Sequence, residues 1–148
     1  MIQEFRKLIT DMELPATFSG LHPISNDEKK LVVFCDCTMT GNHLKLIFTD
    51  VHAFMVHEEF SHPNMDNKGI AGKPPKSEDS IYFYPALEVE NSLWRATFPD
   101  YRLNFSEIVY HYQLLSLSNI LDVLFSGEFD ASYLSREEFA EIKNIFLD

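Results

Sequence analysis

The sequence predicts an α+β domain: a mostly antiparallel sheet of five to six strands with helices packed on one face or end. Segments with a two-residue apolar period follow one another between residues 31 and 117, with no helical segment among them. Helical spacing appears before them, near the N-terminus, and in two segments after them. Sequential strands without intervening helices pair antiparallel, and the flanking helices then cover the sheet.

Length and composition favour one domain over residues 1–148. The chain is 45% hydrophobic and 14% aromatic, which is enough apolar surface for one buried core. No apolar run approaches the roughly 18 residues of a membrane span, and the N-terminal stretch MIQEFRKLITDMELP lacks the apolar region of a secretory signal. We therefore expect a cytoplasmic protein that does not enter a membrane.

The first half of the chain predicts one helix and three strands. Apolar residues at helical spacing predict an N-terminal helix that ends before Pro15; they are Ile2, Phe5, Leu8, Ile9 and Met12. Residues 16–28 are rich in turn formers and predict a connection. KKLVVFCDCTMT and HLKLIFTDV both alternate around the turn formers Gly41-Asn42 and predict a β-hairpin. AFMVHEEF predicts a third strand.

The second half predicts a long surface loop, further strands and two helices. The loop covers residues 61–80, which are rich in Pro, Gly and polar residues. IYFYPALEVEN, SLWRATF and NFSEIVYHYQLLSL predict strands; Pro85 favours an edge strand or a bulge in the first, and apolar residues on both faces favour a central position for the last.

Each of the two predicted C-terminal helices has sequence signals at its ends. SNILDVLFSG has Ser118 as N-cap and Gly127 beyond its end. LSREEFAEIKNIFLD has a capping box at Ser135 and Glu138, and Leu134 can pack on Phe139 as a hydrophobic staple.

The stretch LKLIFTDVHAFMVHEEFSHPNM is a candidate for a metal or catalytic cluster. It contains three histidines and three acidic residues: His52, His57, His62, Asp50, Glu58 and Glu59. On a helix, His57 and His62 would be rotated by about 140° from one another, which prevents convergence on one zinc ion. We interpret these residues as strand polar groups and predict no metal, although the sequence leaves open whether the three histidines converge.

No other motif predicts a cofactor or catalysis. Cys35 and Cys37 are two residues apart in a predicted strand, so they face one side and are expected to be reduced and buried. Glu88 and Glu90 share one strand face, but sequence alone does not place them in a cleft. The chain has no G-x-S-x-G elbow, phosphate-binding loop or dinucleotide fingerprint. We predict a non-enzymatic protein without catalytic residues or cofactors.

Charge is the strongest sequence indication of function. Twelve basic and 23 acidic residues give a net charge of −11, which argues against nucleic-acid binding and against an anionic membrane surface. The charge instead favours a protein partner with a cationic surface. The candidate partner-binding residues are the acids of the predicted sheet and its loops: Glu58, Glu59, Glu88, Glu90, Asp100 and Glu107.

The run LKLIFTDVHAFMVHEEFSHPN resembles the core of small acidic immunity proteins of bacterial polymorphic-toxin systems. This resemblance implies a cytosolic antidote that binds a cognate toxin, such as a basic nuclease, and blocks it. It transfers no functional residue. Two alternatives remain open: a homo-oligomeric interaction or scaffold subunit, with a homodimer formed through an exposed sheet edge, and a small-molecule-binding α+β domain.

Overall fold

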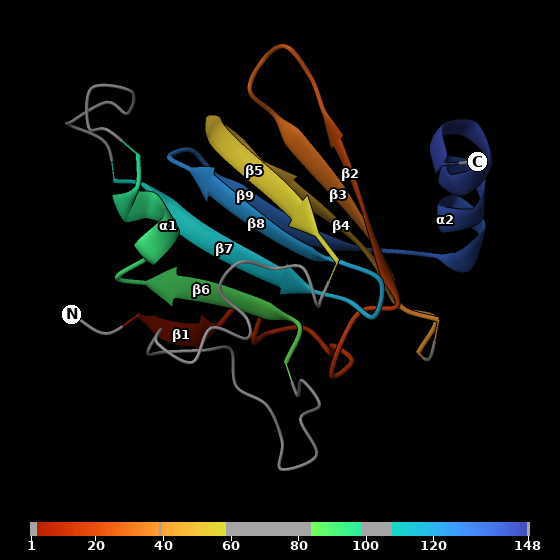
Figure 1. The fold of residues 1–148 in the computed structure, drawn as a ribbon. Coiled ribbons are helices and arrows are strands. Elements are labelled where there is room, and N and C mark those ends of the chain that lie inside the picture. The colour runs from red at the N-terminus through yellow and green to blue at the C-terminus, as the bar shows by residue number, and fades with distance from the viewer. Residues whose placement is uncertain (1–2, 39, 59–83, 99–107, 148) are drawn as a thin grey trace.

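Two antiparallel β-sheets pack face to face (Figure 1). The computed structural model describes residues 3–38, 40–58, 84–98 and 108–147. One sheet has five strands in the order β1-β6-β7-β8-β5, and the other has four in the order β2-β3-β4-β9. The elements are β1 (Glu4–Lys7), β2 (Gly20–Ser25), β3 (Leu31–Asp36), β4 (His43–Phe48), β5 (Val51–His57), β6 (Ala86–Glu90), α1 (Leu93–Ala96), β7 (Tyr110–Leu115), β8 (Ile120–Phe125), β9 (Phe129–Leu134), α2 (Arg136–Ile142) and a π-helical turn (Lys143–Leu147).

The predicted α+β class is wrong, because the described chain is mainly β with two short helices. The largest error is the helix predicted over residues 118–127, which forms strand β8. All six residues of β8, and so side chains on both of its faces, are buried, and the strand lies between β7 and β5. A short apolar run of this kind satisfies helical and strand spacing equally.

The predicted N-terminal helix is also wrong. Residues Glu4–Lys7 form β1, which pairs antiparallel with β6 and places Phe5 opposite Val89. Strand geometry ends before Ile9, whose φ is 57°, and the apolar side chains that follow pack on the core from a loop. The helical spacing in the sequence therefore comes from Phe5, which lies in a strand, and from the apolar residues of the loop that follows it. SLWRATF, predicted as a strand, contains α1.

Several local predictions are confirmed. β3 and β4 form the predicted hairpin, and Gly41 at its turn has a positive φ of 73°. β7 is central in its sheet, as predicted. In α2 the Ser135 side chain accepts from the Glu138 N–H, and Leu134 and Phe139 share one apolar cluster. β2 and β9 were not predicted, and the predicted loop at 61–80 lies outside the described residues.

The core lies between the two sheets. The four-stranded sheet contributes alternating residues of β3 and β4, and the five-stranded sheet contributes residues of β6, β7 and β8. An aromatic group fills the centre, where Phe48 contacts Phe125 with ring centroids 5.1 Å apart and Tyr112 contacts Phe129 at 5.0 Å. Ring contacts at these distances bury the aromatic side chains against one another and stabilise the packing of the two sheets.

Three connections between described strands change from one sheet to the other, and two of these crossings lie side by side. β4 leads to β5 through Thr49 and Asp50, and β8 leads to β9 through residues 126–128. Backbone hydrogen bonds join them, from Gly127 N–H to the Thr49 oxygen (3.2 Å) and from Ser126 N–H to the Asp50 oxygen (3.0 Å). Gly127 is thus a point of close backbone approach, and its predicted place beyond a helix end is wrong.

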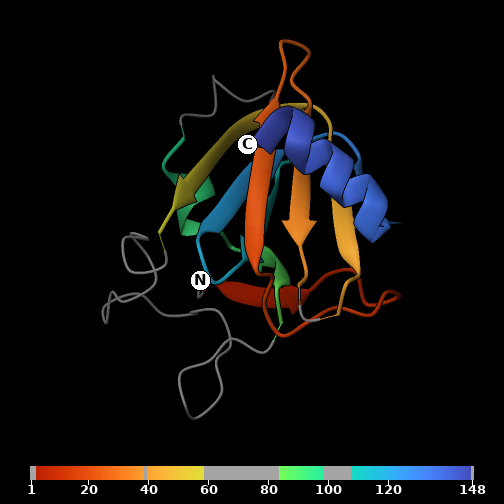
Figure 2. The same cartoon turned by 90° about the vertical axis from the view of Figure 1, so that its right-hand side faces the viewer.

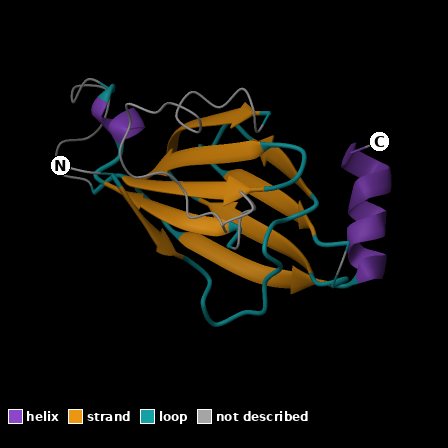
Figure 3. Ribbon diagram, turned by 60° about the horizontal axis from the view of Figure 1, so that its bottom comes forward, coloured by secondary structure: helices purple, strands orange, loops and turns teal. Residues whose placement is uncertain are grey.

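The helices lie at opposite ends of the sandwich (Figure 3). α2 crosses the outer face of the four-stranded sheet (Figure 2), where Phe139 packs with Phe34 and Leu134. α1 lies at the other end, beside β7, and Trp94 contacts the His111 ring at 5.3 Å. Each helix therefore packs against a different sheet.

Candidate functional site

The structure does not gather the predicted acidic patch. Glu88 and Glu90 lie on β6, and both face Arg6 of β1, at 2.7 and 3.8 Å from its guanidinium nitrogens. Their charges are therefore partly neutralised by Arg6. Glu58 is exposed directly after β5, which is separated from β6 by β7 and β8. The other three candidates, Glu59, Asp100 and Glu107, lie outside the described residues.

The two described histidines of the opening cluster lie at opposite ends of β8. His52 Nε2 is 2.6 Å from Ser126 Oγ, just beyond the end of β8, whereas His57 is opposite Ile120 at its start. Five strand residues correspond to about 16 Å, so these two side chains do not share one ion. His62 lies outside the described residues. Among the residues that the structure describes, no group of three metal-ligating side chains converges.

Acidic residues gather instead along β9, the last strand of the four-stranded sheet within the described chain. We call this surface the acidic rim and define it as Asp11, Glu13, Glu128, Asp130 and Tyr133. All five residues are exposed. Asp11 and Asp130 line one cavity of about 280 Å³, although they come from opposite ends of the sequence.

Hydrogen bonds and apolar contacts fix the shape of the acidic rim. The Glu13 N–H donates to Tyr133 Oη (2.7 Å), and the Tyr133 hydroxyl donates to the Glu13 carbonyl oxygen (3.1 Å). The loop that carries Asp11 and Glu13 is held by Leu8 and Met12, which pack on the core. The carboxylates are therefore presented from an anchored backbone.

A second polar group links α1, β7 and β8. Ser92 Oγ lies 2.6 Å from His111 Nδ1, and His111 Nε2 lies 2.6 Å from Asp122 Oδ1. Gln113 Nε2 donates to the same Asp122 oxygen at 3.0 Å. Ser92 is also the N-cap of α1 and accepts from the Arg95 N–H at 3.0 Å. We call Ser92, His111 and Asp122 the serine relay.

The serine relay combines buried and accessible members. Asp122 is 0% exposed and His111 is 5% exposed, because β7 and β8 are central strands. Ser92 and His111 line an open cavity of about 760 Å³ at the end of β6. Apolar side chains from α1 and from the segment before β7 form part of its wall.

The two cysteines are reduced and buried, as predicted. Burial raises the pKa of the Cys35 thiol well above its ordinary value, and burial together with the nearby Asp36 carboxylate raises the pKa of Cys37 to about 12. Thiolates are thus disfavoured, and neither thiol is a nucleophile near neutral pH.

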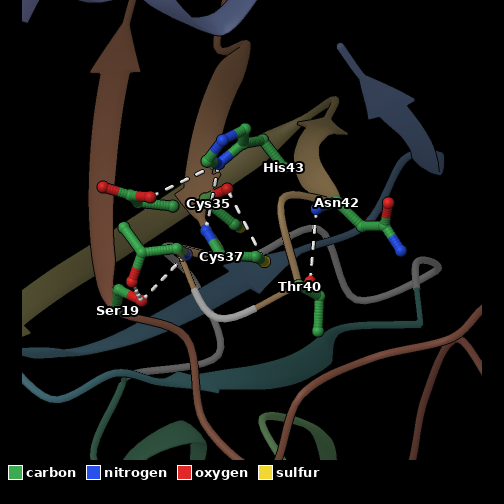
Figure 4. Close-up of polar contacts among 8 residues, drawn as sticks. Ser19, Cys35, Cys37, Thr40, Asn42 and His43 are labelled. Atoms are coloured by element: carbon green, nitrogen blue, oxygen red, sulfur yellow. Dashed lines mark hydrogen bonds and ion pairs between the residues drawn. The ribbon is translucent and has the colours of Figure 1, made fainter. Parts of the chain in front are cut away.

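His43 lies at the end of the β3–β4 hairpin, where it contacts Cys37 (Figure 4), and its ring also contacts α2. Its Nδ1 accepts from the Cys37 N–H at 3.1 Å and lies 3.3 Å from Asp36 Oδ1, while its ring stacks on Phe139 at 4.2 Å. Burial lowers the pKa of His43, and the Asp36 carboxylate opposes this shift without reversing it. The hydrogen bond from Cys37 fits a neutral His43, since Nδ1 must lack a proton to accept the Cys37 N–H.

Comparison of this chain with protein-family models, with curated proteins and with solved structures finds no match. The candidate sites therefore stand on geometry alone. Neither helix of the described chain has the length and apolar character needed to cross a membrane.

Sequence reasoning did not find either candidate site. The serine relay had one sequence signal, which is a polar residue inside each of two otherwise apolar strands: His111 in YHYQLL and Asp122 in ILDVLF. A buried polar residue requires a partner. The acidic rim had no such signal, because its residues are far apart in the sequence and come together only when the loop at residues 8–14 lies against β9.

Proposed function

We propose that this protein binds a cationic protein partner through the acidic rim and acts as an immunity-type inhibitor of a cognate bacterial toxin. The observation that carries the proposal is the placement of Asp11 and Asp130 on one cavity, while the exposed Tyr133 is hydrogen-bonded to Glu13 of the same loop as Asp11. Carboxylates around an exposed aromatic residue match the chemistry of an interface that recognises Lys and Arg.

Charge and anchoring support the same function. A net charge of −11 attracts a basic partner over a distance of about a Debye length, near 8–10 Å at physiological salt. The anchored rim also reduces the entropy lost on binding, because its backbone is already ordered before the partner arrives. An inhibitor that must reach its toxin quickly benefits from both properties.

Co-expression tests the proposal directly. The toxic domain encoded beside this gene is expressed with the native protein, with the Asp11→Lys/Asp130→Lys double variant, or with Asp27→Lys/Glu28→Lys as the matched control. Both double variants change the net charge equally and alter exposed residues. The control residues lie in the turn between β2 and β3, whereas the rim belongs to β9 at the other edge of that sheet.

We expect the native protein and the control variant to protect the cells, and the rim variant to lose protection. Equal protection by both variants would show that the acidic rim is not the surface that binds the toxin. Cells that die equally fast with and without the native protein, or the lack of any toxic domain beside the gene, would show that the immunity function is wrong.

The exposed strand β5 favours a homodimer as the second candidate. β5 is the last strand of its sheet within the described chain, and Phe54 and Val56 are 39% and 43% exposed. An apolar edge strand is a template for pairing with a second chain. Light scattering over a concentration series tests this: a dimer that Val56→Lys dissociates supports the candidate, and a monomer at all concentrations contradicts it.

A further inference from the structure

We propose that Ser92 is a nucleophile that accepts the acyl group of a small uncharged ester, with His111 as its general base and Asp122 as the residue that positions His111. This activity is separate from partner binding, since the serine relay belongs to the five-stranded sheet and the acidic rim to the four-stranded sheet. Each can therefore fail without the other.

The contacts of the serine relay fit an arrangement of protons that suits catalysis. Ser92 Oγ accepts from the Arg95 N–H, and its own hydrogen can be donated to His111 Nδ1 at 2.6 Å. Asp122 accepts from Gln113 Nε2 and, at 2.6 Å, from His111 Nε2. In this arrangement the His111 proton is on Nε2 and Nδ1 accepts, which is the tautomer that a general base requires.

Burial makes the serine relay more effective than the same groups in water. When His111 takes the serine proton, a positive imidazolium forms 2.6 Å from the Asp122 carboxylate. Both side chains are almost fully shielded from solvent, so their attraction is stronger than in water. Three separate elements supply the three residues, and each residue is held by a second contact: Ser92 by the helix cap, His111 by Trp94 and Asp122 by Gln113.

The cavity indicates the class of substrate. Val89, Leu93 and Ile108 give it apolar wall surface. Apolar walls suit a short acyl chain or alcohol group. A small uncharged ester therefore fits this cavity.

The reaction consists of two balanced acyl transfers. Ser92 Oγ bonds to the ester carbonyl carbon while its proton passes to His111 Nδ1, and the tetrahedral adduct releases the alcohol, which takes that proton. Water then attacks the acyl-serine and gives one proton to His111. The C–O bond to Ser92 breaks as Ser92 regains the proton, so one ester and one water yield one acid and one alcohol.

Acetylation by p-nitrophenyl acetate tests the nucleophile. We expect peptide mass analysis to find the acetyl group on Ser92 of the native protein. Ser92→Asn keeps an N-cap side chain, because Asn caps helices as well as Ser, but it removes the hydroxyl; His111→Gln removes the base. Loss of p-nitrophenol release in both folded variants supports the proposal. A native Ser92 that stays unmodified overturns it.

Thiol reactivity tests the geometry without a substrate. In Ser92→Cys, transfer of the thiol proton to His111 should make alkylation by iodoacetamide at neutral pH roughly tenfold faster than in the exposed control Ser118→Cys. Cys35 and Cys37 give little background because both are buried, with raised pKa values. Adding Asp122→Asn should move the midpoint of the pH–rate profile upward. Equal alkylation rates for Ser92→Cys and Ser118→Cys at every pH would overturn the proposal.

Discussion

Replacement of Gly127 by Ala tests the double crossing between the sheets. A Cβ at Gly127 would lie 2.3 Å from Thr49 Oγ1, 2.6 Å from the Thr49 carbonyl oxygen and 2.7 Å from its carbonyl carbon. Unstrained contacts between carbon atoms are about 3.5–4.0 Å, so the two crossings must move apart by roughly 1 Å. This motion would stretch the hydrogen bonds that join them.

The expected cost follows from these distances. Overpacking of this kind costs about 1–3 kcal/mol, and the clash with backbone places Gly127→Ala near the upper end. The lower entropy of the unfolded Ala chain offsets about 0.4–1 kcal/mol. We expect the free energy of unfolding to fall by about 2 kcal/mol, which lowers the Tm by roughly 4–8 °C for a chain of this size.

Gly20→Ala is the matched control. A Cβ there would meet its nearest atom, His22 Nε2, at 3.5 Å, which is an ordinary contact, so stability should change by less than about 1 kcal/mol. Equilibrium urea unfolding followed by circular dichroism measures both variants. The Thr49→Ala/Gly127→Ala double variant should not regain the lost stability, because two of the three close contacts of the new Cβ are to the Thr49 backbone. Equal midpoints for Gly127→Ala and Gly20→Ala would refute the reasoning.

Three further predictions concern α2 and the end of the hairpin. Phe139→Ala should lower the free energy of unfolding by about 3–4 kcal/mol, because this ring is buried under α2; Ile145→Ala, at an exposed site, should change it little in the same urea titration. Burial lowers the pKa of His43, so the contribution of neutral His43 to the free energy of unfolding is complete above the ordinary pKa of 6.5 and is lost as the pH falls below it. The free energy of unfolding should therefore fall between about pH 7 and pH 5, and this fall should be smaller in His43→Asn. Iodoacetamide should leave Cys35 and Cys37 unmodified in the folded protein and label both in urea, as read by intact mass.

Local signals predicted those parts of the fold whose contacts are local. The β3–β4 hairpin needs only alternation and a turn residue such as Gly41, and the start of α2 needs Ser135 as its cap. Both lie within short stretches of sequence, and both were predicted. Interactions within one segment can therefore be predicted without the rest of the chain.

Tertiary context decided the elements that were predicted wrongly. Ile120–Phe125 is a strand because β7 and β5 flank it, and α1 is a helix because Ser92 caps it where β6 ends. The candidate sites depend on the same context. Ser92, His111 and Asp122 meet only when three elements pack together, and Asp11 reaches Asp130 only because the loop after β1 lies against β9.

The central claim is that the acidic rim recognises a cationic protein, and the salt dependence of association tests it most directly. The association rate between this protein and the proposed cognate toxin is measured by stopped-flow at increasing ionic strength. Electrostatic steering predicts that the rate falls by about tenfold or more from low to high salt, and that Asp11→Lys/Asp130→Lys flattens this dependence. A rate that does not change with salt, or an unchanged slope in that variant, would contradict the claim.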